Sequence, residues 1–141
     1  MIFSYVLIVA IIVHIICQLY KLIYYSIKEK KFTFKYFISA GGMPSTHSAF
    51  TSALTISLGL KEGFHSHYFA IAFVFSAVVI YDSLRLRGAV QLHAEIIKRL
   101  IILLPKSKRI KVPQMVGHTL SEIIIGILIA FIISFAAHLL I

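Results

Sequence analysis

Two histidines of this chain stand in settings suited to phosphate chemistry, and the first follows a pair of glycines. In the stretch Gly-Gly-Met-Pro-Ser-Thr-His-Ser (41–48), two conformationally flexible glycines precede a proline, and proline suits the first turn of a helix. A helix start offers unpaired N–H groups and the positive end of the helix dipole, which favour an anion. Gly42, Ser45 and Thr46 are therefore predicted to bind phosphate, and His47 to donate a proton near neutral pH. The simpler alternative is a capped helix start with an incidental histidine.

The second histidine begins the stretch His-Thr-Leu-Ser-Glu (118–122). His118 and Glu122 are four residues apart, so on a helix they share one face. A carboxylate bonded to one imidazole nitrogen fixes the tautomer and leaves the other nitrogen available as a nucleophile. Two alternatives stay open: a pair of zinc ligands, although a zinc site needs more protein ligands than two, or a purely structural pair.

A third polar cluster, Asp82, Arg85 and Arg87, ends a long uncharged segment. An acid in such a position needs a partner, because an unpaired charge in an apolar setting is unfavourable. Arg87 can bind two phosphate oxygens at once, and Asp82 can hold that guanidinium or a histidine in place. The alternative is an anchor at the membrane surface with arginines that reach the headgroups.

The composition indicates a membrane protein. The chain has 141 residues, of which 60% are hydrophobic, and its mean hydropathy is +0.95. The net charge of +9 would suggest nucleic acid in a soluble chain, but here the basic residues lie between apolar runs, as in loops that meet anionic headgroups. We therefore expect one domain over residues 1–141 that has a lipid bilayer, not nucleic acid, as its partner.

Four apolar segments are long enough to cross a bilayer, at roughly 20 residues each. They cover residues 2–26, 44–60, 68–84 and 119–141, and the first is predicted to be a retained helix, since its positive charges follow it. Residues 88–104 have amphipathic helical spacing and are predicted to lie along the interface or to continue the third helix. The expected fold is an all-α, polytopic membrane bundle of about four transmembrane helices plus this additional helix.

The positive charges between these segments predict the orientation of the chain. Five lysines lie near the end of the first segment or after it, only Lys61 lies between the second and third, and eight basic residues follow the third. The first set is Lys21, Lys28, Lys30, Lys31 and Lys35; the last is Arg85, Arg87, Lys98, Arg99, Lys106, Lys108, Arg109 and Lys111. This bias places both basic loops in the cytoplasm and both termini outside.

All three polar clusters then open on the cytoplasmic face. An anion cradle, an arginine, an oriented nucleophile and a second histidine together suit phosphoryl transfer. No nucleotide-binding loop, dinucleotide motif or carboxylate cage for magnesium is present in the sequence, so neither a metal nor another cofactor is predicted.

Small residues recur at every fourth position on two of the segments, which predicts close helix packing. They are Ser45, Ala49, Ala53 and Ser57 on the second segment, and Gly126, Ala130 and Ser134 on the fourth. A transporter subunit that oligomerises through the Gly126 ridge is a further alternative. Below the clusters, the polar residues considered for a path through the bilayer are only Ser57, Ser76, Ser134 and His14.

At these motifs the sequence resembles the divergent, bacterial-type branch of the type 2 phosphatidic acid phosphatase and vanadium haloperoxidase-related superfamily. Gly-Gly-Met-Pro-Ser-Thr-His-Ser-Ala (41–49) is close to that branch's G-G-M-P-S-S-H-S-A signature. Residues 117–126 match its G-H-x-x-x-E-x-x-x-G signature, and Asp82 with Arg87 matches its acid-plus-arginine motif. Gln18 and Lys21 fit a weaker Q-x-x-K pattern. Arg85 stands where this branch usually has glycine, and Gly88 where it has arginine.

The resemblance implies a metal-independent lipid phosphatase. His118, oriented by Glu122, would form a phosphohistidine; His47 would protonate the leaving lipid oxygen; Arg87 and Lys21 would clamp the phosphate. The expected substrate is a phosphomonoester of a glycerolipid, such as phosphatidylglycerophosphate or phosphatidate, because these are made on the cytoplasmic leaflet. The alternatives are a phosphatase acting on isoprenyl (di)phosphates and a non-catalytic protein that binds anionic lipid or phosphate. A homo-oligomer is possible in each case.

Overall fold

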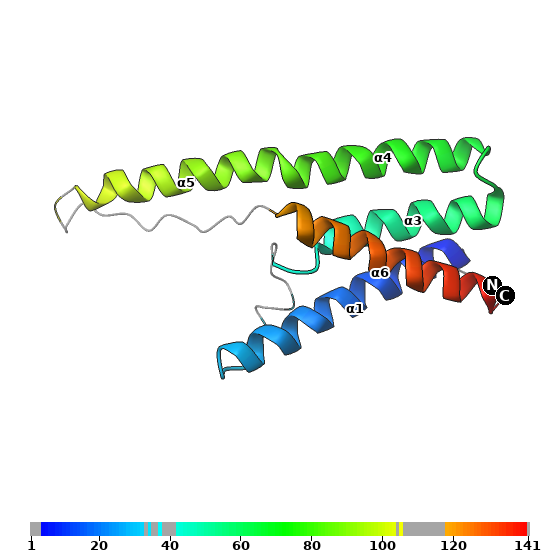
Figure 1. The fold of residues 1–141 in the computed structure, drawn as a ribbon, viewed down its shortest axis with the longest axis horizontal. Coiled ribbons are helices and arrows are strands. Elements are labelled where there is room, and N and C mark those ends of the chain that lie inside the picture. The colour runs from blue at the N-terminus through cyan, green and yellow to red at the C-terminus, as the bar shows by residue number, and fades with distance from the viewer. Residues whose placement is uncertain are drawn as a thin grey trace.

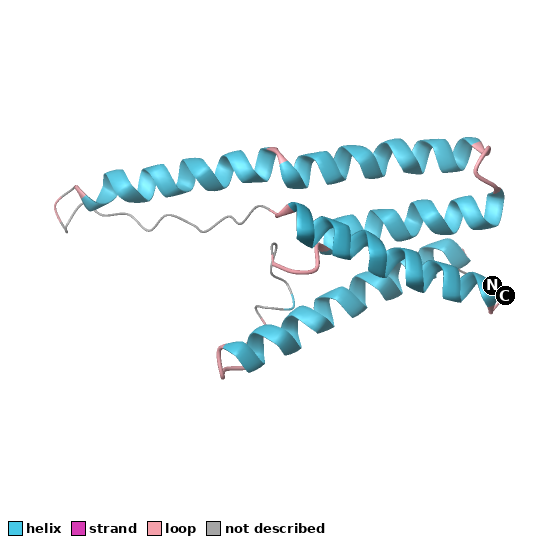
Figure 2. Ribbon diagram, in the orientation of Figure 1, coloured by secondary structure: helices cyan, strands magenta, loops and turns pink. Residues whose placement is uncertain are grey.

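The computed structural model describes residues 4–32, 34, 37, 42–103, 105 and 118–140. Within these residues the chain forms five helices and no strand (Figures 1 and 2), which confirms the all-α class. The helices are α1 (Tyr5–Lys28), α3 (Thr46–Glu62), α4 (His67–Leu84), α5 (Leu86–Ile102) and α6 (Leu120–Leu139). Each lies within a few residues of a segment expected from the sequence.

Three helical runs are long and apolar enough to cross a membrane: α1, the run of α4 with α5 (His67–Ile102), and α6. About four spans were expected, and α3 is the segment that differs. It has 17 residues, which is about the lower limit of length for a span, and it is the most polar of the four. This polarity is tolerated because α3 lies at the centre of the bundle, between α1, α4 and α6.

The core of the bundle is made of small side chains, which let the helix backbones approach closely. Its buried members come from α1, α3 and α6 and are Ala10, Val13, Cys17, Ala49, Ala53 and Ala130. The large apolar side chains of α1, α4 and α6 instead point outward, as expected where a bilayer replaces water as the solvent.

Gly126 of α6 lies at a close contact between α6 and α3. A Cβ atom at this position would lie 2.6 Å from the carbonyl oxygen of Ser45 and 3.3 Å from the amide nitrogen of Ala49. The predicted close packing of the two small-residue ridges is thereby confirmed. The Gly126 ridge, considered above as an oligomer contact, is buried against α3 of the same chain.

The interface between α3 and α4 is held by buried hydroxyl groups. Thr55 Oγ1 donates to the carbonyl oxygen of Ala72 at 3.0 Å, and Ser76 Oγ donates to the carbonyl oxygen of Thr51 at 2.8 Å. The hydroxyl groups of Thr55 and Ser76 are 2.7 Å apart. The sequence analysis considered only four polar residues in the interior of the bundle. The structure shows further buried polar groups there, so the interior is more polar than expected. Because these hydroxyls bond to backbone carbonyls, they join the two helices.

Figure 1 shows both chain termini at one end of the bundle, together with the turn between α3 and α4. The starts of α3 and α6 and the ends of α1 and α4 lie toward the opposite end. Beyond that end α5 continues the direction of α4, so the second of the two arrangements expected for the amphipathic segment is the one observed. The helix ends that carry the three polar clusters are thus on one side of the bundle.

Candidate functional site

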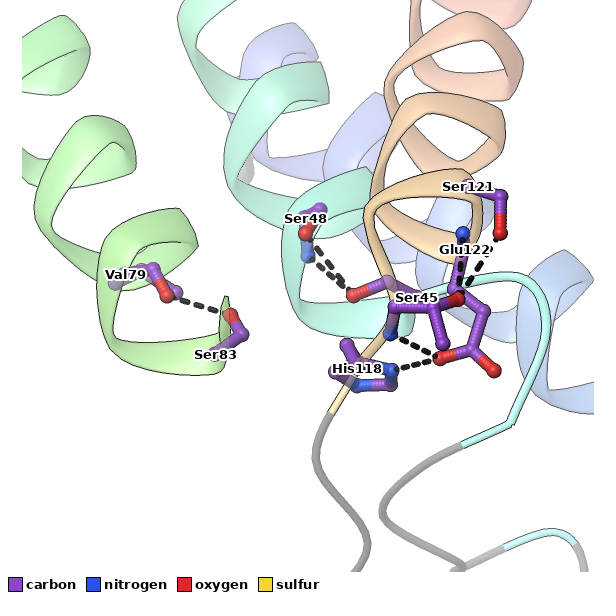
Figure 3. Close-up of polar contacts among 8 residues, drawn as sticks. Ser45, Ser48, Val79, Ser83, His118, Ser121 and Glu122 are labelled. Carbon is purple, nitrogen blue, oxygen red and sulfur yellow. Dashed lines mark hydrogen bonds and ion pairs between the residues drawn. The ribbon is translucent and has the colours of Figure 1, made fainter. Parts of the chain in front are cut away.

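The first turn of α6 is closed by a reciprocal pair of hydrogen bonds (Figure 3). Thr119 is the N-cap residue, and its Oγ1 accepts from the amide nitrogen of Glu122 at 3.4 Å. In return, Oε2 of Glu122 accepts from the amide nitrogen of Thr119 at 3.1 Å. Such a capping box satisfies two N–H groups of the helix start and fixes the position of the carboxylate.

The same carboxylate oxygen also holds His118. The distance from Nδ1 of His118 to Oε2 of Glu122 is 2.9 Å, so the hydrogen bond expected between these side chains is present. The reason differs from the one expected, since His118 precedes the helix and does not share a helix face with Glu122. A carboxylate acceptor requires the proton on Nδ1, which leaves the lone pair on the buried Nε2.

The start of α3 is tied directly to this turn. The amide nitrogen of Ser45 donates to the carbonyl oxygen of Glu122 at 2.9 Å. Ser45 is the N-cap residue of α3: its Oγ accepts from the amide nitrogen of Ser48 at 3.4 Å and lies 2.9 Å from the Ser48 hydroxyl. The two helix starts therefore lie side by side, and the rings of His47 and His118 come within 6.1 Å between centroids.

Two of the predicted phosphate ligands lie at this helix start. Thr46 is only 2% exposed, and its hydroxyl oxygen has no hydrogen-bond partner within the described part of the chain. Gly42 has φ of +75°, and a Cβ there would collide with the Tyr25 hydroxyl, which is also hydrogen-bonded to the backbone of Met43. The end of α1 thus shapes the glycine loop, and Tyr25 is a site residue that the sequence motifs did not identify.

Lys21 is the buried cation of the site. It is only 1% exposed, and the charge of Glu122 acts on its ammonium group. A lysine inside a membrane helix bundle is unfavourable unless a charge or a ligand compensates it, so its burial makes this region a candidate site. The sequence carried a signal for this burial, because Val13, Cys17, Lys21 and Tyr25 follow one another at every fourth position of α1.

The end of α4 reaches the site through its backbone. The amide nitrogen of His118 donates to the carbonyl oxygen of Ser83 at 3.4 Å. Asp82, the preceding residue, is partly buried, whereas Arg85 is exposed at the helix end. Arg87 falls within α5, but its side chain lies outside the described residues, as do Gly41, Gly117 and the basic loop 106–113.

The structure brings most of the predicted site residues together. The helix starts bring together His47, His118, Glu122, Ser45 and Thr46, and Lys21 is close enough to Glu122 to interact with its charge. Among the described residues, no three His, Cys, Asp or Glu side chains gather as a set of metal ligands. The arrangement is a helix start, a position that favours anions, next to a histidine that a carboxylate holds in one orientation.

These features define a helical membrane protein with paired histidines where two helices begin. The chain matches the Divergent PAP2 family over residues 3–133 of its 141 and belongs to that family, which confirms the resemblance seen in the motifs. It is 28% identical over 126 residues to the "Uncharacterized membrane protein YuiD" of Bacillus subtilis (strain 168), with 79% of this chain and 80% of that protein covered. No solved structure matches the chain.

Proposed function

We propose that the protein hydrolyses the phosphomonoester of a membrane lipid through a phosphohistidine on His118. The observation that carries the proposal is the fixed pair of His118 and Glu122, 2.9 Å apart, with the His47 ring 6.1 Å from that of His118 at the start of α3. Membership of the Divergent PAP2 family supports a phosphatase-related role.

In the first step, Nε2 of His118 attacks the phosphorus atom of the lipid phosphate. The bond between phosphorus and the lipid oxygen breaks, and the leaving oxygen takes a proton from the His47 imidazolium. In-line transfer needs the nucleophile within about 3–3.5 Å of phosphorus and the acid within about 3 Å of the leaving oxygen. One ring nitrogen from each histidine must therefore reach the same phosphate group, and the two ring centroids lie 6.1 Å apart.

In the second step, water attacks the phosphorus of the phosphohistidine. His47, now neutral, takes the proton of this water, the phosphorus–nitrogen bond breaks, and inorganic phosphate leaves. Glu122 stabilises the positive charge that His118 carries while it is phosphorylated, because its carboxylate already accepts the Nδ1–H. His118 returns to its starting form, and His47 is again protonated, as it was before the first step.

The phosphate is held by the helix start and by cations. The amide groups at the start of α3 and the buried Thr46 hydroxyl supply hydrogen bonds, and the positive φ of Gly42 lets the loop turn into this helix start. Lys21 supplies a buried positive charge. Arg87 would add two hydrogen bonds from the α4–α5 side, with Asp82 orienting its guanidinium.

The test is phosphate release by the detergent-purified protein in the presence of a chelator. The panel contains phosphatidylglycerophosphate, phosphatidate, an isoprenyl monophosphate and an isoprenyl diphosphate. We expect chelator-resistant release from at least one glycerolipid phosphate, together with an acid-labile phosphoprotein when the reaction is stopped early. Preferential release from an isoprenyl phosphate would show that the substrate is not a glycerolipid phosphate. Tight binding without release from any lipid, by folded protein, would favour the non-catalytic binding protein and contradict the proposal.

We also propose that the site faces the cytoplasm and that both termini lie outside. The distribution of lysine and arginine supports this orientation. Lys30 is exposed beyond the end of α1, and Lys61 is exposed at the opposite end of the bundle. In intact cells, a membrane-impermeant amine reagent should label Lys61 and spare Lys30, as read by mass spectrometry. Labelling of Lys30 without permeabilisation would reverse the orientation.

A further inference from the structure

We infer that the apolar groove between α3 and α4 holds an acyl chain of the substrate lipid. This inference rests on the proposed function. It adds a subsite for the acyl chain, which the sequence motifs of the phosphate site do not address. The groove has a volume of about 230 Å³ and is lined by Leu54, Leu58, Tyr68, Ile71, Ala72 and Phe75.

The groove exists because a small residue stands where the two helices touch. Thr55 Oγ1 donates to the carbonyl oxygen of Ala72 at 3.0 Å, which draws the backbones together at this level. Ala72 is only 4% exposed and leaves space above its methyl group, while the larger side chains Leu54 and Phe75 stand on either side. The hydroxyl groups of the helix contact are engaged with one another and with carbonyls, so the groove lining is apolar.

On α3 the groove lies directly below the proposed acid. Leu54 and Leu58 follow His47 by seven and eleven residues, and at 100° per residue both fall within about 20° of His47 around the helix. All three belong to the partly exposed stripe of a helix that is otherwise mostly buried. With a rise of about 1.5 Å per residue, the two leucines lie about 10 and 16 Å from His47 along the helix.

On α4 the opposite wall leads toward the third polar cluster. Val79 and Asp82 follow Ala72 and Phe75, respectively, by seven residues, which places each within about 20° of its counterpart around the helix. Asp82 is partly buried near the contact of α4 with His118. Each wall of the groove is one face of a helix. The α3 face leads toward His47 and the α4 face toward Asp82, and both residues are assigned to the phosphate site.

The depth of the groove matches one leaflet. A lipid whose phosphate lies at the helix starts has its headgroup at the interface, and its chains extend about 15 Å toward the bilayer midplane. The groove occupies about the 10–16 Å range below His47, near the bilayer midplane, where the end of an acyl chain would lie. An acyl chain gains little by exchanging lipid neighbours for apolar side chains, so the groove orients a chain and does not bind it tightly.

The groove can be filled by one substitution. Ala72→Phe should lower kcat/KM for a long-chain lipid phosphate by about tenfold and leave that for a water-soluble, short-chain phosphomonoester unchanged, since only the long chain reaches the groove. Val74→Phe is the matched control: Val74 lies on α4 but is 62% exposed on another side of the helix. Equal loss on both substrates, or equal loss in both variants, would overturn the inference.

A second measurement does not depend on turnover. A lipid phosphate with a photoreactive group near the end of its chain should crosslink to peptides carrying Leu58 or Phe75, and Ala72→Phe should reduce this several-fold. A phosphatidylcholine probe at equal density measures contact with bulk lipid, and equal crosslinking by both probes would overturn the inference. Groove crosslinking specific to the phosphate probe, without phosphate release, would contradict the proposed function and leave the groove assignment standing.

Discussion

Replacing His118 with alanine is expected to lower the rate of phosphate release by about 10⁴-fold or more, because the nucleophile is lost while binding groups remain. The same variant should form no acid-labile phosphoprotein. His138→Ala is the matched control, since His138 is exposed in the last turn of the same helix, α6. Wild-type release by a folded His118→Ala protein would show that the phosphoryl group does not pass through this residue.

Substitutions of Glu122 separate two effects in the same assay: the orientation of the His118 ring and the negative charge next to it. Glu122→Gln keeps a carbonyl oxygen for Nδ1 of His118 and for the Thr119 amide, but it removes the negative charge that stabilises the phosphorylated ring. We expect a fall in kcat of about 100-fold with little change in KM, within the range seen when a preorganised charge is removed. Glu122→Ala should cost more, because the capping box is lost as well.

Gly126→Ala is expected to destabilise the bundle by about 1–3 kcal/mol, the usual range for overpacking a tight contact. The added Cβ would lie 2.6 Å from the carbonyl oxygen of Ser45, and this backbone atom cannot move aside by a rotamer change. The helices must separate, which also strains the bond between Ser45 and Glu122. Activity should therefore fall together with stability, as followed by thermal unfolding in detergent.

Gly88→Ala is the control for helix propensity. Gly88 is also inside a helix, and no atom lies within 4 Å of the position its Cβ would take. Alanine there should be neutral or stabilising by up to about 1 kcal/mol, because glycine is a poor helix former. If Gly126→Ala proved as stable as Gly88→Ala, α6 and α3 would not be in the close contact described.

The helices were largely predictable because their signals are local. Length, apolarity and the cap residues Ser45 and Thr119 set the helix boundaries, and the recurrence of small residues showed which faces pack. The central place of α3 was not predictable in this way. Its polarity was compatible with a short span, and only the contacts with three other helices show why Thr51 and Thr55 are tolerated.

At the candidate site, the sequence motifs predicted which residues lie together, but not the contacts that bring them together. His118 and Glu122 were paired for a helical reason, whereas the capping box of Thr119 is what brings the carboxylate to the imidazole. The distance between His47 and His118 could not be predicted, because it depends on how α3 and α6 pack around Gly126. Tyr25 was missed because it belongs to no motif and enters the site only through its contact with the glycine loop.

One oxygen of Glu122 accepts from both the Thr119 amide and the His118 ring, so the first turn of α6 and the orientation of the proposed nucleophile depend on the same contacts. Fraying of a helix end requires only a small part of the free energy of global unfolding. When the first turn of α6 opens, the imidazole loses its acceptor although the membrane-embedded core stays intact. On warming, activity should therefore be lost at a lower temperature than the one at which the bundle unfolds. A ligand that binds to this turn would stabilise both the turn and the activity.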